Sequence, residues 1–71
     1  MKDRTFYVYV KGRLVGRLSY ENGWCYYDDY RLNETATDLD MRDLEEAQET
    51  LIDYYIKDIP CNYGDVAFIE E

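Results

Sequence analysis

The dipeptide Asn22-Gly23 restricts the fold of this chain more than any other feature of the sequence. It stands between two segments rich in β-branched, leucine and aromatic residues, 14–20 and 24–30. A two-residue type I′ hairpin turn needs positive φ at both central residues, and Asn-Gly is the pair that adopts this conformation most readily. Pairing outward from the turn sets Tyr20 against Cys25. The dipeptide therefore predicts two antiparallel strands and their register.

The segment TFYVYV (5–10) alternates as a strand, with its valines on one face. A three-residue loop after it would place Leu14 and Leu18 on that same face, whereas a two-residue Lys11-Gly12 turn would place them on the other. We favour the three-residue loop because it makes one continuous apolar face. Gly16 within the second strand indicates a bulge or a close neighbour.

The third strand belongs to the stretch GWCYYDDYRL (23–32), in which four of ten residues are aromatic. Its alternation puts Cys25 and Tyr27 on the core face and one aspartate on each face. Neither aspartate is expected to be deeply buried without a partner, so we expect the strand to leave the core near Asp28. The other face then carries an exposed aromatic row, which consists of Trp24, Tyr26 and Tyr30.

From Asp38 onward the apolar period becomes that of an amphipathic helix. Its core positions are Met41, Leu44, Ala47, Leu51, Tyr54 or Tyr55, and Ile59. We expect Asp40 to be the N-cap, with Asp43 three residues later, and Pro60 to stop the helix. Residues 32–39 form the crossing to the helix, and a short strand within it is left open.

The last segment, VAFIEE (66–71), predicts a strand that is apolar on both faces, which places it inside the sheet or under the helix. The order is β-β-β-α-β, an α+β fold with one antiparallel sheet and one amphipathic helix packed on it. Seventy-one residues predict a single domain over 1–71. A chain of this size buries only about 60% of its unfolded surface, which leaves little room for a deep catalytic cleft.

The residue types argue against catalysis. The chain has no histidine, so it lacks the commonest general base and metal ligand. Asp28 and Asp29 are neighbours on a strand and point to opposite faces, so they cannot act as a catalytic pair. Cys25 and Cys61 match no metal or redox spacing; we expect buried thiols and leave a disulfide open. We expect no enzyme, no cofactor and no metal site.

No run approaches the roughly 18 to 20 apolar residues that span a bilayer. The first residues lack the apolar region of a signal peptide, and an acidic protein is repelled by anionic lipid. We therefore expect a cytoplasmic protein that does not bind membranes.

The net charge of −8 is unevenly distributed. Residues 1–31 carry six Lys/Arg and four Asp/Glu, for +2, and residues 32–71 carry two and twelve, for −10. Seven of these acids lie within sixteen residues: Asp38, Asp40, Asp43, Glu45, Glu46, Glu49 and Asp53. On one helix they would span about 24 Å, or one per roughly 3.4 Å. Phosphates along one DNA strand have a similar spacing. A solvated face that keeps the protein soluble is the alternative.

These acids and the aromatic row together form the predicted partner-binding surface, to which Asp28 and Asp29 also belong. Tyrosine and tryptophan suit interfaces because they bury a large area with few rotors. Alternatively, these aromatics pack on one another or on Tyr7 and Tyr9. Direct binding of nucleic acid is not expected because the whole molecule repels phosphate, although the first hairpin is basic.

With WCYYDDY beside TDLDMRDLEEAQETLIDYY, the chain resembles the small acidic inhibitors of host defence that phages and mobile elements encode. Anti-CRISPR proteins and DNA-mimic inhibitors of restriction systems belong to this class. The resemblance covers the whole chain in style and rests on no shared motif. It implies an inhibitor that occupies a cationic nucleic-acid-binding surface of a host nuclease complex. Whether DNA, RNA or an acidic protein patch is imitated is left open.

The second hypothesis is a self-associating structural or accessory module without catalytic activity. In such a homodimer the basic first hairpin of one copy meets the acidic helix of another.

Overall fold

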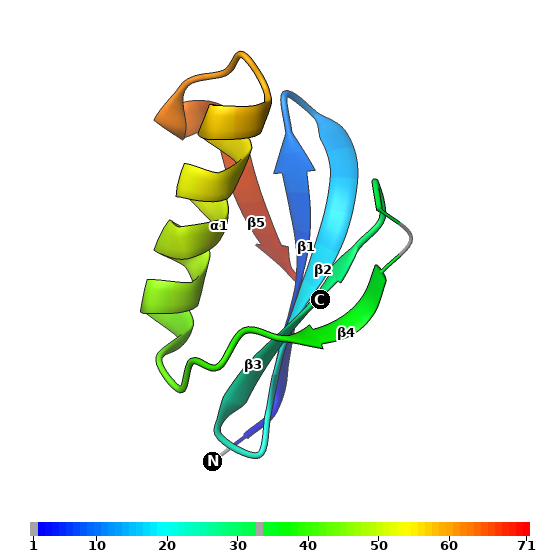
Figure 1. Ribbon diagram of the computed structural model, residues 1–71. Coiled ribbons are helices and arrows are strands. Elements are labelled where there is room, and N and C mark those ends of the chain that lie inside the picture. The colour runs from blue at the N-terminus through cyan, green and yellow to red at the C-terminus, as the bar shows by residue number, and fades with distance from the viewer. Residues whose placement is uncertain (1, 33) are drawn as a thin grey trace.

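The structure is a computed structural model that describes residues 2–32 and 34–71, and for residues 34–37 it describes the backbone alone. The elements are β1 (Arg4–Val10), β2 (Arg13–Glu21), β3 (Trp24–Asp29), β4 (Glu34–Asp38), α1 (Leu44–Asp58), the 3-10 helix η1 (Tyr63–Asp65) and β5 (Val66–Glu70). The strands form one sheet in the order β4-β3-β2-β1-β5, with every neighbouring pair antiparallel. Helix α1 packs on one face of the sheet (Figure 1).

The predicted α+β class, an antiparallel sheet with one packed helix, is confirmed. The crossing between β3 and the helix contains the short strand that the sequence left open, and this β4 adds a fifth strand at one edge. Among the described residues, no helix has both the length and the apolar character needed to cross a membrane.

The turn between β2 and β3 is the one that Asn-Gly predicts. Asn22 and Gly23 have φ of 52° and 82°, and Tyr20 pairs with Cys25. The hairpin therefore has the predicted register, which places Cys25 and Tyr27 in the core.

The turn between β1 and β2 differs from the prediction. Lys11 and Gly12 both have positive φ, 51° and 79°, so the loop has two residues rather than three. Leu14 consequently lies on the outer face, 41% exposed. The register then shifts at a β-bulge, which reverses the alternation and returns Leu18 to the core as predicted. Val15, the additional residue at the bulge, is buried.

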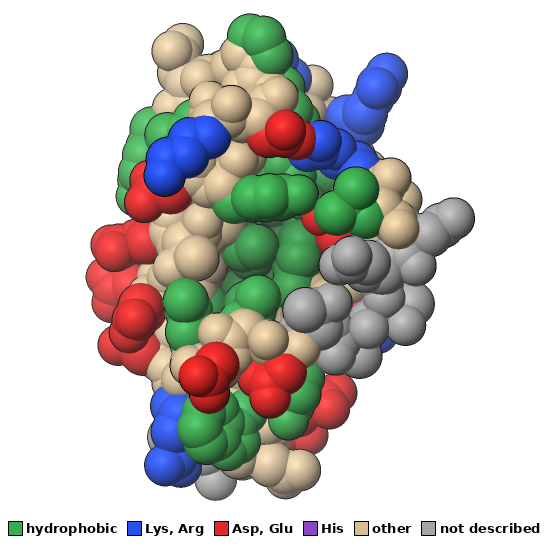
Figure 2. Space-filling model, viewed as in Figure 1, with side chains coloured by type: hydrophobic (Ala, Val, Ile, Leu, Met, Phe, Trp, Pro, Cys, Tyr) green, Lys and Arg blue, Asp and Glu red, His purple; other side chains and the backbone are tan. Residues whose placement is uncertain are grey.

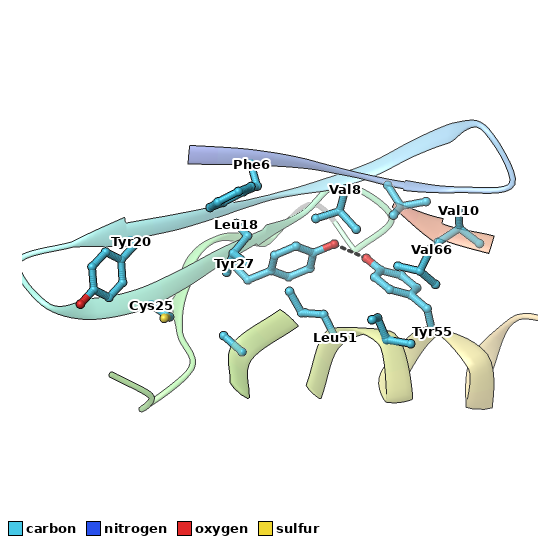
Figure 3. Close-up of a cluster of buried hydrophobic side chains, with 13 residues drawn as sticks. Phe6, Val8, Val10, Leu18, Tyr20, Cys25, Tyr27, Leu51, Tyr55 and Val66 are labelled. Atoms are coloured by element: carbon cyan, nitrogen blue, oxygen red, sulfur yellow. Dashed lines mark hydrogen bonds between the residues drawn. The ribbon is translucent and has the colours of Figure 1, made fainter. Parts of the chain in front are cut away.

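The core lies between the sheet and α1 (Figure 3). From the helix it takes Ala47, Leu51, Ile52 and Tyr55. Tyr55 is fully buried and Tyr54 is exposed, which decides between the two tyrosines that the helical period left open. The Tyr55 hydroxyl forms a hydrogen bond with the hydroxyl of Tyr27 on β3 inside this core (Figure 3).

The helix begins later than its apolar period suggested. Its N-cap is Asp43, whose carboxylate accepts hydrogen bonds from the backbone N–H groups of Glu45 (3.0 Å) and Glu46 (3.4 Å). Asp40 is not the N-cap, because the chain just before the helix still runs beside β3. There the Met41 carbonyl accepts from the Cys25 N–H at 2.9 Å. The helix ends at Asp58, two residues before the proline.

Strand β5 lies at the edge of the sheet and not inside it, and its inner face packs under α1, which is the second of the two positions that the sequence left open. Val66 and Phe68 face the core, and β5 lies beside α1 (Figure 1). Ile69, on the outer face, is 55% exposed. The apolar residues on both faces do not indicate two covered sides, because no described element covers the outer face of this strand.

Candidate protein-binding surface

Four carboxylates lie along one exposed side of α1. We call them the acidic stripe, which comprises Glu45, Glu46, Glu49 and Asp53. At 3.6 residues per turn, they fall within an arc of about 100° around the helix axis. The buried residues of the helix lie outside this arc. Figure 2 shows acidic side chains along the outer margin of the molecule on the side where α1 lies.

No described lysine or arginine neutralises the acidic stripe. All eight lysines and arginines lie in the described part of the chain. Three of them form ion pairs with described acids, and none of these acids belongs to the stripe. Arg4 bonds Glu70 at 2.8 Å, and this lowers the pKa of the Glu70 carboxyl group. Arg31 bonds Asp58. Within the described residues, no cation forms an ion pair with the stripe, so its charge is available to an external partner.

The other three acids of the predicted surface lie outside the helix. Asp38 ends β4 opposite Tyr26, Asp40 lies in the connection to α1 with φ of 55°, and Asp43 is the N-cap. The prediction that one helix carries all seven carboxylates is therefore wrong. From Glu45 to Asp53 the successive rises are about 1.5, 4.5 and 6 Å, a mean of about 4 Å.

The aromatic row does not share a surface with the acidic stripe. Trp24 and Tyr26 alternate with buried residues of β3, so they lie on the face of the sheet opposite α1. Both are half-buried, and the Arg42 guanidinium lies over the Trp24 ring at 5.1 Å. Tyr30 follows the end of β3 and is 44% exposed. One flat partner surface cannot contact both this row and the outward side of α1.

Asp28 and Asp29 point to opposite faces, as the alternation predicts. Asp28 forms an ion pair with Arg17 at 2.9 Å. The expectation that β3 leaves the core near Asp28 is wrong, because Asp29 is only 5% exposed. Its carboxylate accepts hydrogen bonds from the Arg31 backbone N–H (3.0 Å) and the Tyr54 hydroxyl (3.3 Å), and these replace water.

A pocket of about 360 Å³ opens beside Asp29, between α1 and the β3–β4 side of the sheet. We call it the Asp29 pocket, and it is lined by Tyr27, Asp29, Leu32, Leu39, Thr50, Leu51 and Tyr54. Figure 2 shows the hollow next to α1, with hydrophobic side chains on its floor. Sequence reasoning missed this pocket, because its walls come from four separate segments. The burial of Asp29 marks the pocket in the structure, but it depends on Tyr54 of the helix and is not visible in the local sequence.

Burial raises the pKa values of Tyr27, which lines the pocket, and of Tyr55, its hydrogen-bond partner in the core. Burial raises the pKa of Tyr55 to about 12. Burial and the hydrogen bond with Tyr55 raise the pKa of Tyr27 as well. Both hydroxyls therefore stay protonated and serve as hydrogen-bonding groups.

Cys25 and Cys61 are free thiols, which decides the disulfide question that the sequence left open. Cys25 is buried, and burial raises its pKa, with smaller contributions from Asp43 and Glu46. Among the residues that the structure describes, no group of three or more Cys, Asp or Glu side chains is arranged to hold a metal ion.

Comparison with known proteins finds no family model, no curated protein and no solved structure that matches this chain.

Proposed function

We propose that this protein is a non-catalytic inhibitor that binds a basic, nucleic-acid-binding surface of another protein through the acidic stripe. The observation that carries the proposal is the charge of the stripe. Its four carboxylates lie on one exposed side of a helix, while the ion pairs of the described residues all involve other acids. Unpaired charge of one sign attracts a partner of the other sign and accelerates the encounter.

The class of partner we propose is a nuclease complex of host defence, encountered in the host cytoplasm. This part of the proposal rests on the likeness in size, acidity and tyrosine content to anti-CRISPR and DNA-mimic inhibitors. The mean axial rise of about 4 Å between stripe carboxylates is close to the phosphate rise of about 3.4 Å along a DNA strand. A cationic groove that accepts phosphates would accept these carboxylates as well.

The proposal predicts that reversing two stripe charges abolishes most of the binding. Tagged wild-type protein would capture its partner from nuclease-treated lysate of the natural host, and the partner would be released as salt rises. Against the purified partner, Glu46→Lys/Glu49→Lys should weaken affinity by at least about tenfold, since each reversal replaces an attraction by a repulsion.

The matched control is Glu21→Lys/Glu71→Lys, which changes the net charge equally at two exposed positions outside α1. This control should lose far less affinity than the stripe variant. Equal affinity of the stripe variant and wild type would contradict the proposal. Equal losses in both double variants would show that only net charge matters, and would contradict the role of the stripe.

Self-association remains the second candidate because the tip of the first hairpin is basic and exposed. Lys11 and Arg13 lie there, and neither forms an ion pair within the described residues. Arg4 and Arg17 of the same hairpin are already paired to acids. Sedimentation equilibrium at low salt and high protein concentration distinguishes the candidates, since a monomer there excludes this dimer.

A further inference from the structure

We propose that the Asp29 pocket receives an arginine side chain of the partner protein, with its guanidinium group on the Asp29 carboxylate. The inference rests on the proposed function and deepens it, since it specifies one contact with the basic partner. It is carried by the charge, the lining and the position of the pocket.

No described cation compensates the charge of the pocket. Asp29 is 5% exposed, and the donors found for its carboxylate among the described residues are neutral, a backbone N–H and the Tyr54 hydroxyl. None of the eight lysines and arginines, which are all described, forms an ion pair with it. The nearby Arg31 directs its guanidinium to Asp58 instead. A buried carboxylate without a cation is costly, and its four lone-pair sites suit a bidentate guanidinium.

The lining of the pocket selects a cation with an apolar stem. Leu32, Leu39 and Leu51 provide aliphatic wall, and Tyr27 and Tyr54 contribute aromatic rings. An arginine side chain has three methylenes that pack on such a wall. Its guanidinium is planar and weakly hydrated, and it stacks on aromatic rings better than an ammonium does.

The position of the pocket connects it to the acidic stripe. Thr50 and Tyr54 line the Asp29 pocket and also a second hollow on the outer side of α1, which Asp53 of the stripe borders. Around the helix axis, these two residues lie between the stripe and the buried side. A partner that rests on the stripe can therefore extend a side chain across Thr50 and Tyr54 into the pocket.

The pocket can be tested without the partner by NMR titration of the ¹⁵N-labelled full chain with n-butylguanidinium. The uncharged isostere n-butylurea is the matched ligand. We expect saturable shifts of the Asp29, Leu39 and Leu51 amides, and affinity at least about tenfold higher for the cation. Similar affinity for both ligands, or no saturable shift at these amides, would overturn the proposal.

Two variants test whether the cation binds in the Asp29 pocket. Asp29→Asn should remove the preference for the cation, and its amide spectrum reports whether the fold is retained. Thr50→Phe changes an exposed helix position at the pocket wall and should block both ligands. It provides the test if Asp29→Asn does not fold. A preference that survives in Asp29→Asn, or unchanged binding in Thr50→Phe, would place the cation elsewhere and overturn the proposal.

The two proposals fail in distinguishable ways. Glu46→Lys/Glu49→Lys should retain n-butylguanidinium binding while losing the partner, whereas Asp29→Asn should lose the ligand preference and also weaken partner binding by about tenfold. If Asp29→Asn binds the partner as wild type does, the pocket does not receive a partner arginine and the inference fails. The role of the stripe stands in that case, because its variants test it separately.

Discussion

The Tyr27 hydroxyl lies where a side chain at Gly16 would begin. A Cβ built on Gly16 overlaps that hydroxyl and comes within 2.6 Å of the Asp28 carbonyl oxygen. The same hydroxyl is hydrogen-bonded to Tyr55 on the helix, so it cannot move aside without breaking a buried contact. The absence of a side chain at Gly16 thus leaves room for the hydrogen bond between Tyr27 of the sheet and Tyr55 of the helix.

Gly16→Ala should therefore destabilise the protein by about 1 to 3 kcal/mol, the usual cost of overpacking a core. In a domain of this size that lowers Tm by about 4 to 8 °C for each kcal/mol. Thermal unfolding followed by circular dichroism measures the change. Gly64→Ala is the control, because a Cβ at Gly64 would meet no described atom within 4 Å beyond its chain neighbours, and its φ is not positive. Equal Tm values for the two variants would contradict this account.

Single residues could be predicted where a local rule decides the conformation. Asn22-Gly23 specified a turn and a register. Gly16 indicated a bulge or a close neighbour, and the structure shows both at this position. The burial of Asp29 could not be predicted in this way. One of its hydrogen-bond donors is Tyr54, 25 positions away on the helix, so no local pattern contains the information.

Among the elements, α1 shows how tertiary contacts decide where a periodic segment becomes helical. The apolar period extends back to Met41, yet the helix begins at Leu44. The residues just before it are held beside β3, where the Leu39 N–H donates to the Cys25 carbonyl at 3.1 Å. This backbone pairing outweighs the helical propensity of the segment. Asp43 is therefore the N-cap of α1, and Asp40 is not.

Replacing Asp43, the observed N-cap, should lower the free energy of unfolding more than replacing Asp40, the N-cap expected from the sequence. Asp43→Ala should lose about 0.5 to 2 kcal/mol of unfolding free energy, whereas Asp43→Asn should retain most of it because asparagine also caps. Asp40→Asn should have little effect, since asparagine tolerates the left-handed conformation at that position. Urea denaturation of the three variants and of wild type measures their free energies of unfolding. A loss for Asp40→Asn as large as that for Asp43→Ala would contradict the assignment of the N-cap.

The strands show the same limit of sequence reasoning. The alternation of β1 was readable, but the bulge in β2 changes which side chains face the core halfway along the strand. A period of two carries no information about where it will be interrupted. The edge position of β5 was also unreadable, because a short apolar strand has the same composition at an edge as in the middle of a sheet.

For the whole molecule, the distribution of charge matters more than its total. The sequence shows which half of the chain is acidic, and the structure shows that four of the seven acids of segment 38–53 share one side of the helix. Glu45, Glu49 and Asp53 follow one another at intervals of four residues, the spacing at which like charges repel. This repulsion destabilises the isolated protein, and a cationic partner would relieve it.

Adding salt should therefore raise Tm, because screening weakens the repulsion within the stripe. Exposed ion pairs such as Arg4–Glu70 contribute too little to reverse this trend. At low salt Glu49→Gln, which removes both repulsive pairs and lies beyond the first turn of α1, should melt at a higher temperature than wild type and respond less to salt. Scanning calorimetry over a range of NaCl concentrations tests this, with Glu21→Gln as the control of equal net charge. A Tm that falls as salt is added would contradict it.

The pairing of β1 with β5 has a consequence for the order in which the sheet is completed. The hairpins β1–β2 and β2–β3 join neighbouring segments, so their loops close at little entropic cost. The free side of β1 pairs with residues 66–70, about 60 positions later. At roughly 5 to 20 residues per second, a ribosome takes about 3 to 12 seconds to add them. During synthesis β1 is therefore made several seconds before β5, and the rate of translation determines how long this edge of β1 remains unpaired.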